Sequence, residues 1–577
     1  MNILQCAKIP KPRDEAGASW PAIAMGFFVA FGGVLYGQVE SNPLYPIPSF
    51  TNHFHLCSRY DTGTISGIMA MPYWKDLFST GFRNSNGDLD ITTSQESAIV
   101  SILSAGTFFG ALASPLLADF FGRRPALMIS TWVFNLGVVL QTIATAIPMF
   151  LAGRFFAGFG VGLISALIPL YQSETAPKWI RGAIVGAYQL AITIGLLLAA
   201  VVNNATANRP DSGSYRIPIA IQFAWSLVLF VGMIFLPETP RFLIRSGKMD
   251  KASAALSRMR RLDKAHPAVV AELGEIKANL DYESGVSKAS YWDCFKPPIL
   301  KRQFTGMALQ ALQQLTGINF IFYYGTRYFQ NSGVSSGFTI AMITSAINVV
   351  STIPGLLAID KWGRRPLLLA GAIGMCVSQL IVAVCGTLST GQHENGDIFV
   401  KNIAGQQTAV AFVCIFIFFF ASTWGPLAWV VTGEIFPLTT RAKSLSMSTA
   451  TNWLLNWAIA YSTPYLVNYG QGFANLQSKI FFVWFGACFI CIAHVWFFIY
   501  ETKGLSLEQV DQLYTEVSSA RKSTKWTPTE TWEEHRQREP SVVGQMGDVI
   551  AEQEPKDDAP NVVMNSTHVE QRGSDSA

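Results

Sequence analysis

Long apolar segments are the feature that most constrains this chain. A helix that crosses a lipid bilayer needs about 20 mostly apolar residues. A stretch at 20–70 begins and ends like such a helix, although polar residues interrupt its middle. Eleven further segments meet the requirement, at 95–117, 126–146, 148–170, 182–202, 218–236, 303–330, 336–358, 366–388, 406–432, 443–468 and 477–499. Only 14% of the residues are charged, whereas a soluble protein carries about 25%. The sequence therefore predicts an all-α membrane protein with twelve transmembrane helices.

Basic residues gather in every second connection between these segments. They include Arg123 with Arg124, the run through 241–302, and Arg441 with Lys443. Cytosolic loops are enriched in Lys and Arg, so both termini and the linker are expected in the cytosol if 20–70 counts as one crossing. The predicted organisation is a cytosolic N-terminus at 1–19, a six-helix half at 20–237, a cytosolic linker with short helices at 238–302, a second six-helix half at 303–500, a cytosolic helix at 501–520 and a disordered cytosolic tail at 521–577.

Three motifs occur in the same order in both halves. ADFFGRRP at 118–125 returns as IDKWGRRP at 359–366, and SETAPKWIRG at 173–182 returns as GEIFPLTTRA at 433–442. PETPRFLIRSGK at 237–248 has a weaker counterpart in YETKGLSLEQ at 500–509. Two six-helix halves joined by a cytosolic linker are the parallel repeats of a major-facilitator transporter.

The repeated motifs lie at the predicted cytosolic ends of helices. Arginines, carboxylates and helix termini can pair there. We predict that they pair across the two halves while the carrier faces outward and separate when it opens inward. The alternative is that the basic residues only fix the topology. The predicted cytosolic gate has one cluster of Asp119, Arg123, Arg124, Glu174, Arg181 and Glu238 and a second of Asp360, Arg364, Arg365, Glu434, Arg441 and Glu501.

A set of motifs resembles the sugar porter branch of the major facilitator superfamily. They are YDTGTISG at 60–67, GRFFAGFGVG at 153–162, PETPR at 237–241, QQLTGINFIFYYG at 313–325, DKWGRR at 360–365 and ETKGLSLE at 501–508. The resemblance covers about 20–515, and STWGPLAWVVTGEIFP at 422–437 is similar to fungal monosaccharide carriers in particular. It implies a hexose:proton symporter of the plasma membrane, with glucose as the expected sugar and no enzymatic activity. A facilitative uniporter, a sugar sensor with a transporter fold, and a different cargo such as a pentose, disaccharide, polyol or quinate remain alternatives.

The resemblance also implies a sugar site made of uncharged polar side chains. Asn and Gln amides both donate and accept hydrogen bonds and carry no charge that must be desolvated. A tryptophan can lie against the apolar face of a pyranose ring. A lone Asn or Gln in a membrane helix can instead bind a neighbouring helix. Ala421 stands where some family members have a carboxylate, which leaves the sugar preference open. The matching positions are Gln189, Gln313, Gln314, Asn319, Asn348, Trp429 and Asn452.

Asp61 is a carboxylate within the first predicted span. Such a residue costs about 2.5–3.5 kcal/mol on insertion scales and is a functional candidate by default. Arg154, the basic residue of the fourth span, is its expected partner. In the family that the chain resembles, proton-driven symporters have Asp at this position. We therefore hypothesise that Asp61 takes a proton from outside and loosens its pairing with Arg154. The alternative is a static ion pair.

The segment Gln38–Arg59 interrupts the first span with three prolines, two histidines, a glutamate and an arginine. Its removal joins FGGVLYG directly to YDTGTISG. The 22 residues correspond to 66 nucleotides at three per residue, a length that suits a short fungal intron, and Val39 and the Ser58-Arg59 pair can encode the GT and AG dinucleotides. We hypothesise a retained intron or a gene-model error. The alternative is a loop that splits the helix and is sheltered from lipid.

The remaining features exclude several classes. The net charge of +4 gives no reason to invoke nucleic acid, and the eight scattered cysteines show no metal-binding or disulfide spacing. Gly158, Gly160 and Gly162 lie in an apolar helix and indicate close helix packing rather than a nucleotide loop. Asn204 begins a weak glycosylation sequon on an expected outside loop. The expected partners are a monosaccharide, a proton and the lipid bilayer, without a cofactor or metal.

Overall fold

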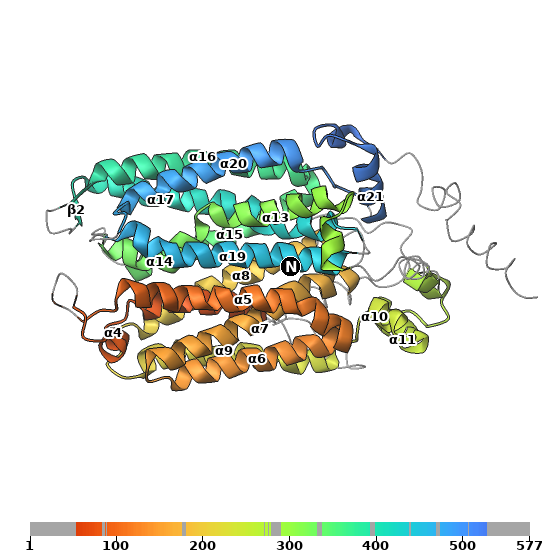
Figure 1. The fold of residues 1–577 in the computed structure, drawn as a ribbon, viewed down its shortest axis with the longest axis horizontal. Coiled ribbons are helices and arrows are strands. Elements are labelled where there is room, and N and C mark those ends of the chain that lie inside the picture. Colours follow the sequence, from red (N-terminus) through yellow and green to blue (C-terminus); the bar gives the residue numbers. More distant parts are fainter. Residues whose placement is uncertain are drawn as a thin grey trace, which may run out of the picture. The chain divides into compact units, whose positions relative to one another are not determined.

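A computed structural model describes most of the chain between residues 54 and 527 (Figure 1). The internal residues outside the description are 84–86, 88, 176–180, 271, 275, 278–289, 332–336, 393–397, 438–439, 469–472 and 506. Residues 1–53 and 528–577 also lie outside it. These ranges contain the predicted N-terminus at 1–19, most of the segment Gln38–Arg59 and most of the predicted tail. The described chain continues past Ala520 into a 3-10 turn, η5 (Lys522–Lys525).

The first half is a bundle of long helices (Figure 1). A short helix, α4 (Pro72–Phe78), follows the first of them. The long helices are α3 (Phe54–Ile68), α5 (Thr93–Phe121), α6 (Arg123–Ile143), α7 (Ile147–Thr175), α8 (Arg181–Thr206) and α9 (Gly213–Phe235). The linker then forms α10 (Pro240–Arg245), α11 (Met249–Arg260) and the 3-10 turn η2 (Tyr291–Phe295), in agreement with the short helices predicted there. Leu243 and Ile244 of α10 pack on Ala252 and Ala255 of α11.

The second half repeats this plan with two interrupted helices. Its elements are α13 (Ile299–Leu315), α14 (Ile318–Asn331), α15 (Gly337–Trp362), α16 (Arg364–Ser389), α17 (Ile403–Phe419), the π-helical turn η3 (Phe420–Trp424), α18 (Gly425–Glu434), α19 (Arg441–Val467), the 3-10 turn η4 (Gln477–Lys479) and α20 (Ile480–Phe498). A small antiparallel pair, β1 (Thr390–Gln392) and β2 (Ile398–Val400), joins α16 to α17 with Thr390 opposite Val400. The last helix is α21 (Leu507–Glu516).

Twelve helical positions follow from these elements. Among the described residues, nine helical stretches are long and apolar enough to cross a membrane. The other three positions are α3, the α13–α14 pair, and α19, which carries the polar Arg441, Lys443, Asn452 and Asn456. The predicted single helix at 303–330 is wrong in one respect, because it breaks at Gly317. That residue has φ +87°, and an added Cβ would lie 2.5 Å from the Trp484 ring.

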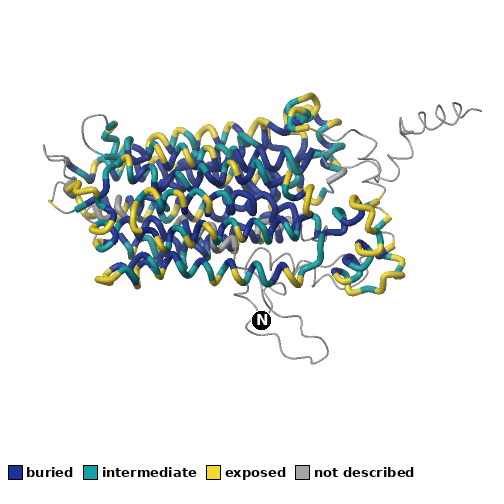
Figure 2. Tube along the Cα trace, turned by 60° about the horizontal axis from the view of Figure 1, so that its bottom comes forward, coloured by how far each residue is buried: buried dark blue, intermediate teal, exposed yellow. Residues whose placement is uncertain are grey.

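The two halves lie side by side, with α5 against α19 and α8 against α15 (Figure 1). The linker helices and α21 lie at the same end of the bundle, which we call the linker end. Buried residues fill the interior, and exposed residues line the outer surface (Figure 2). Large apolar side chains such as Leu116, Trp132 and Leu388 are exposed there, as expected of a surface that faces lipid.

Close backbone packing confirms the interpretation of the glycines in α7. A Cβ added to Gly158 would lie 2.1 Å from the Leu103 carbonyl oxygen of α5, and one added to Gly162 would lie 2.2 Å from the Thr107 carbonyl oxygen. Gly160 approaches the Phe134 backbone of α6 in the same way. These glycines let three helices pack at backbone distance, and no nucleotide loop is formed.

Candidate functional site

Four of the predicted sugar-binding side chains meet in one buried hydrogen-bonded cluster. Gln314 Nε2 donates to Asn452 Oδ1 at 2.7 Å, and Asn452 Nδ2 donates to Gln313 Oε1 at 2.8 Å. Asn319 Nδ2 donates to Gln314 Oε1. The break at Gly317 places Asn319 on α14 beside the glutamines of α13, although a chain bend separates the two helices. We call Gln310, Gln313, Gln314, Asn319 and Asn452 the amide cluster.

Gln310 belongs to this cluster and was missed by the sequence analysis. Its Oε1 accepts a hydrogen bond from Asn452 Nδ2 at 2.7 Å, and its Nε2 donates to Thr432 Oγ1 at 3.2 Å. The signal was present in the sequence, because Gln310 precedes Gln313 and Gln314 by three and four residues. Side chains at this spacing share one face of a helix.

Gln189 and Trp429 both lie where α8 of the first half meets α18 of the second. Gln189 of α8 is buried, and its amide lies about 3 Å from where a Cβ of Gly425 would stand. The ring of the adjacent Tyr188 meets the Trp429 ring edge to face, with centroids 5.0 Å apart. This contact joins α8 to α18. The first residue of α18, Gly425, is bonded to the amide cluster, because its carbonyl oxygen accepts a hydrogen bond from Gln313 Nε2 at 3.0 Å.

Asn348 is placed differently from the other predicted residues. It is buried on α15, and its Oδ1 has no hydrogen-bond partner among the described residues. The structure does not join it to the amide cluster. A buried amide oxygen without a partner is costly, so this atom is available to a ligand hydroxyl.

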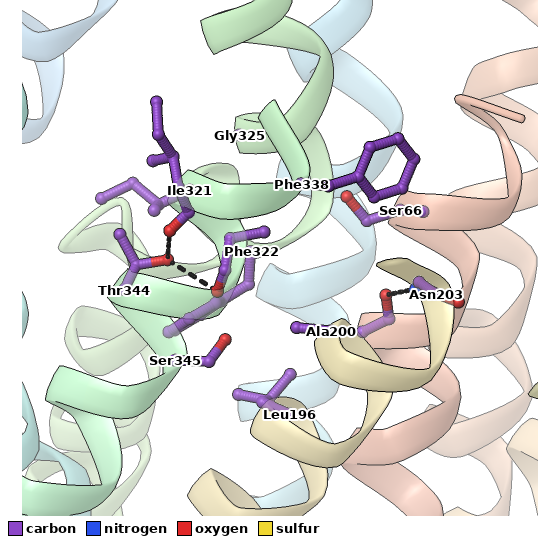
Figure 3. Close-up of a pocket in the computed structure, with 14 residues that line it drawn as sticks. Ser66, Leu196, Ala200, Asn203, Ile321, Phe322, Gly325, Phe338, Thr344 and Ser345 are labelled. Carbon is purple, nitrogen blue, oxygen red and sulfur yellow. Dashed lines mark hydrogen bonds between the residues drawn. The ribbon is translucent and has the colours of Figure 1, made fainter. Parts of the chain in front are cut away.

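A small cavity lies between α3, α8, α14 and α15 (Figure 3). Ser66 and Asn203 line it from the first half, and Phe322, Thr344 and Ser345 line it from the second (Figure 3). Its volume of about 30 Å³ holds about one or two water molecules. Asn203 Nδ2 is taken up by the Gly63 and Thr64 carbonyl oxygens at 3.0 and 3.2 Å. The cavity is therefore too small for a sugar in this conformation.

Asp61 and Arg154 form the predicted ion pair. Arg154 Nη1 lies 3.4 Å from Asp61 Oδ2, and both side chains are almost fully buried. Arg154 Nε also donates to the Ile99 carbonyl oxygen at 2.6 Å. The second carboxylate oxygen of Asp61 accepts a hydrogen bond from Gln222 Nε2 at 3.0 Å. Gln222 of α9 was not predicted, because one polar residue in an apolar span does not reveal which helix it faces.

The first motif cluster is organised around Glu238. Its carboxylate accepts the backbone amides of Arg123 at 3.1 Å and Arg124 at 3.0 Å, at the start of α6. Burial raises the pKa of Glu238 although these amides oppose the effect. Arg123 Nη2 lies 2.9 Å from Glu174 Oε1. Burial acts to raise the pKa of Glu174, but Arg123, Thr239 and Arg241 together outweigh it, so this pKa lies below its ordinary value.

The second motif cluster has the same geometry. Glu501 accepts the backbone amides of Arg364 and Arg365, each at 3.0 Å. Arg364 Nη2 lies 2.9 Å from Glu434 Oε1. Arg441 donates to the Gly433 carbonyl oxygen at the end of α18.

These ion pairs lie within single halves, so pairing across the halves in an outward-facing state stays a prediction. Each of them joins two elements of one half, because the carboxylates come from the ends of neighbouring helices. Asp119 pairs with Arg245 of the linker at 3.0 Å rather than with Arg123 or Arg124. The side chains of Arg181 and Asp360 lie outside the described residues.

Neutral hydrogen bonds connect the halves. Ser446 Oγ of α19 donates to the Ala111 carbonyl oxygen of α5 at 2.8 Å, and Tyr291 Oη of η2 donates to the Leu112 carbonyl oxygen at 3.0 Å. Deeper in the bundle, Ser104 Oγ of α5 donates to Asn456 Oδ1 of α19 at 3.0 Å. Bonds of this kind can break and reform without exposing a buried charge.

The sequon at Asn204 lies in the last turn of α8, not in the loop that was predicted. Asn204 is exposed, but Thr206 is buried and its hydroxyl donates to the Val202 carbonyl oxygen at 3.0 Å. The hydroxyl that defines the sequon is thus engaged by the helix.

A bundle of two similar halves, crossed by apolar helices around a buried amide cluster, defines a membrane carrier for a polar solute. The family model described as "Sugar (and other) transporter" matches residues 51–514. The chain belongs to this sugar transporter family of the major facilitator superfamily. It is therefore a multi-pass membrane transporter with the twelve-helix fold, and not an enzyme.

Several relatives align over most of the chain. The major facilitator-type transporter ecdD of Aspergillus rugulosus is 63% identical over 90% of this chain and 92% of its own length. The probable glucose transporter rco-3 of Neurospora crassa is 47% identical, over 91% of this chain and 84% of its own length. The high glucose sensor RGT2 of Saccharomyces cerevisiae is 41% identical over 88% of this chain, which spans 62% of that longer protein.

A solved structure supports the same fold. The proton:xylose symporter XylE bound to 6-bromo-6-deoxy-D-glucose is 26% identical, with a TM-score of 0.68. The match covers 80% of this chain and 96% of XylE.

Proposed function

We propose that this chain carries a hexose, with glucose as the expected sugar, across the plasma membrane by alternating access. The observation that carries the proposal is the convergence of the predicted Gln313, Gln314, Asn319 and Asn452 in one buried cluster. Neutral amides match sugar hydroxyls, which also donate and accept. The relative rco-3, described as a probable glucose transporter, favours glucose as cargo.

Sugar binding would exchange bonds within the amide cluster for bonds to the sugar. In the structure the amides satisfy one another, which keeps a buried polar site stable without a ligand. Hydroxyl groups of a hexose would replace these mutual bonds and reach the unpartnered Asn348 Oδ1. Trp429 would turn its ring toward the sugar, and its edge-to-face contact with Tyr188 would then change.

Alternating access would follow from separating the halves at the linker end. The Tyr188–Trp429 contact and the hydrogen bond from Ser446 join the two halves, and the hydrogen bond from Tyr291 joins the linker to α5. The ion pairs within each half would keep α6 and α16 fixed to their own bundles while the bundles rock. In this proposal both chain termini and the linker lie in the cytosol.

Proton coupling is proposed to run through Asp61 and Arg154. A proton delivered to Asp61 would remove the negative charge that faces Arg154 at 3.4 Å, which weakens the attachment of α3 to α7. Gln222 would keep its hydrogen bond to the carboxyl group and hold the side chain in place. Protonated Asp61 would then permit the inward switch with sugar bound.

The test is uptake of labelled glucose in yeast that lacks its own hexose carriers, with and without a protonophore. We would express the chain with and without Gln38–Arg59 and compare the parent with Asp61→Asn. Concentrative uptake that collapses with the protonophore in the parent supports symport. Uptake that only equilibrates and ignores the protonophore shows a facilitator. If uptake by the Asp61→Asn variant keeps its full sensitivity to the protonophore, Asp61 has no role in proton coupling.

A sugar sensor is the second candidate, because RGT2 is 41% identical over 511 residues. A sensor would bind glucose at the amide cluster without accumulating it. The same uptake assay, combined with direct binding of labelled glucose to purified protein, separates the two: binding without uptake favours the sensor.

The segment Gln38–Arg59 needs a separate test. The family match begins at residue 51, within this segment, and α3 begins at Phe54. Sequencing the transcript across Tyr36–Asp61 decides between an intron and a translated loop. A message that always contains all 66 nucleotides of the 22 codons would end the intron hypothesis.

A further inference from the structure

The last described segment folds back onto the linker end of α16 and α20. The backbone N–H of Glu501 donates to Ser523 Oγ at 2.9 Å, and Ser523 Oγ donates to the Ala520 carbonyl oxygen at 2.6 Å. Trp526 Nε1 donates to Glu516 Oε2 of α21 at 2.8 Å. These bonds fix the turn that carries Arg521, so its side chain is presented in a defined direction.

Arg521 lies over two aromatic rings at the end of α20. Its guanidinium carbon is 4.8 Å from the centre of the Trp496 ring and 5.4 Å from that of Phe497. These rings are 43% and 58% exposed. Aromatic side chains at the end of a membrane helix lie at the level of the lipid headgroups. Among the described residues, Arg521 pairs with no carboxylate.

Arg365 brings a second guanidinium to the same ring. Its guanidinium carbon is 5.5 Å from the centre of Trp496, and its Nη2 donates to the Trp496 carbonyl oxygen at 3.0 Å. Its Nε is buried and has no partner in the described chain. The two positive charges at one ring repel each other. Lys522 and Lys525 are exposed in the same turn and add to the charge.

The nearby carboxylates balance this charge only in part, because Glu501, which attracts Arg365, and Glu516 face four basic side chains, those of Arg365, Arg521, Lys522 and Lys525. Both oxygens of Glu501 are occupied by the backbone amides of Arg364 and Arg365, and Lys503 N–H adds a third bond. Glu516 is held by Trp526 and Gln512. The cluster therefore has an excess of positive charge at a boundary with lipid.

The first half shows that this arrangement is not required by the fold. Arg124 occupies the place of Arg365 in the repeated motif. Its Nε and Nη2 donate to the carbonyl oxygens of Met233 and Ile234, each at 2.7 Å. Both of these N–H groups of Arg124 therefore have carbonyl acceptors. Arg365 Nε, in contrast, has no acceptor among the described residues, and Arg521 has no carboxylate partner there.

We propose that Arg365, Arg521, Trp496 and Phe497 form a binding site for an anionic phospholipid of the leaflet at the linker end. The phosphate lies between the two guanidinium groups, whose planar forks suit its oxygens. The acyl chains lie along the exposed faces of Trp496 and Phe497. Lys522 and Lys525 attract the anionic headgroup. This site is independent of the sugar and proton sites proposed above.

The test measures lipid binding to the purified full-length chain by native mass spectrometry. The probes are phosphatidylserine and phosphatidylcholine with the same acyl chains, added in turn. We expect the parent to retain phosphatidylserine and Arg521→Gln to retain it about fivefold less, the effect of one basic residue at a membrane surface. Arg521→Lys keeps the charge but loses the fork and is expected to lie between them.

Arg258→Gln is the matched control, because it removes one exposed positive charge from α11, away from the rings. It is expected to bind phosphatidylserine like the parent. Equal binding by Arg521→Gln and Arg258→Gln would overturn the proposal, and so would equal binding of the two lipids. Inorganic phosphate that displaces the lipid at comparable concentration would show a site for a soluble anion instead. The melting temperature of Arg521→Gln in phosphatidylcholine, compared with that of the parent, verifies that the variant is folded.

Discussion

The two halves share one framework at the linker end and differ in what they bury at the centre. Glu238 and Glu501 both accept two successive arginine amides at 3.0–3.1 Å. The Arg123–Glu174 and Arg364–Glu434 pairs both measure 2.9 Å. At the centre, the first half buries the Asp61–Arg154 ion pair, whereas the second half buries the neutral amide cluster.

This difference suggests a division of roles. A buried ion pair is costly to break, because each charge then stays unpaired in a low dielectric. It suits a step that is controlled by adding a proton. Neutral amides exchange one hydrogen-bond partner for another at low cost, which suits a ligand with many hydroxyl groups. We therefore expect substitutions in the Asp61–Arg154 pair to change proton coupling and substitutions in the amide cluster to change sugar affinity. Matching substitutions in the shared framework are expected to lower stability to a similar degree in both halves.

The largest loss of stability is expected from removing one charge of the Asp61–Arg154 ion pair. Asp61→Leu leaves Arg154 buried without its carboxylate, and such a change destabilises a protein by about 3–5 kcal/mol. The measurement is the melting temperature of the purified protein in detergent, together with its yield from membranes.

A double variant tests whether this effect comes from the unpaired charge. Asp61→Leu with Arg154→Met replaces the pair by apolar side chains and is expected to regain most of the stability without regaining protonophore-sensitive uptake. If the double variant is as unstable as Asp61→Leu, then packing and not charge explains the loss.

The second largest effect is expected on glucose affinity when an amide of the amide cluster is removed. Gln314→Leu leaves Asn452 Oδ1 and Asn319 Nδ2 without their present partners and removes an amide from the proposed sugar site. We expect affinity for glucose to fall by about 1–3 kcal/mol, or about 5- to 150-fold. The measurement is the glucose concentration that half-saturates uptake.

Gln222→Leu is the matched control in the first half. It removes a buried glutamine that contacts Asp61 and not the amide cluster. We expect it to leave glucose affinity near the parent value and to alter the protonophore response. A loss of affinity as large as that of Gln314→Leu would contradict the division of roles.

The framework could be predicted from the sequence because its residues stand in repeated motifs. The order GRR, then Glu, then a second Glu marks the same places in both halves, and the structure joins Arg123 to Glu174 and Arg364 to Glu434 as two clusters. The Asp61–Arg154 pair was also predictable, because two opposite charges in apolar spans must find each other. Nine of the eleven predicted spans coincide with described helical stretches that are long and apolar enough to cross a membrane, so they followed from length and hydropathy.

The partners within each half could not be predicted in the same way. Sequence shows that a residue lies at a helix end but not which bundle that end faces, so it did not predict that Arg123 pairs with Glu174 and Arg364 with Glu434 inside their own halves. Gln222 and Asn456 were missed because each is a single polar residue whose partner, Asp61 or Ser104, lies more than 100 residues away. The break at Gly317 depends on Trp484, which comes from a different helix.

Two glycines test whether the shared framework is equally strict in both halves. Gly122 and Gly363 have φ of +96° and +95° with ψ near 170°, a region that other residues adopt at a cost of about 1–3 kcal/mol. An added Cβ would lie 2.6 Å from Glu238 Oε2 at the first glycine and 2.7 Å from Glu501 Oε2 at the second. We expect Gly122→Ala and Gly363→Ala to lower the melting temperature to a similar degree. Gly433→Ala, where an added Cβ meets no atom within 4 Å, is the control. A much larger effect in one half would show that the two clusters are not equivalent.

The smallest expected effect is the loss of stability on removing one threonine hydroxyl beside the glutamate of each motif cluster. Thr502 Oγ1 donates to Glu434 Oε2 at 2.7 Å. At the matching place in the first half, Thr239 Oγ1 and Glu174 Oε2 are buried and do not reach hydrogen-bond geometry, although Thr239 helps to lower the pKa of Glu174. Thr502→Val should therefore cost about 1 kcal/mol, the net value of one hydrogen bond, because Arg364 Nε still donates to Glu434 Oε2, and Thr239→Val should cost less. Melting temperatures of the two variants, measured in the same detergent, check the difference. If Thr239→Val is the more harmful, the hydroxyl of Thr239 must bind Glu174 in the working protein, and the two clusters are then more alike than their hydrogen bonds indicate.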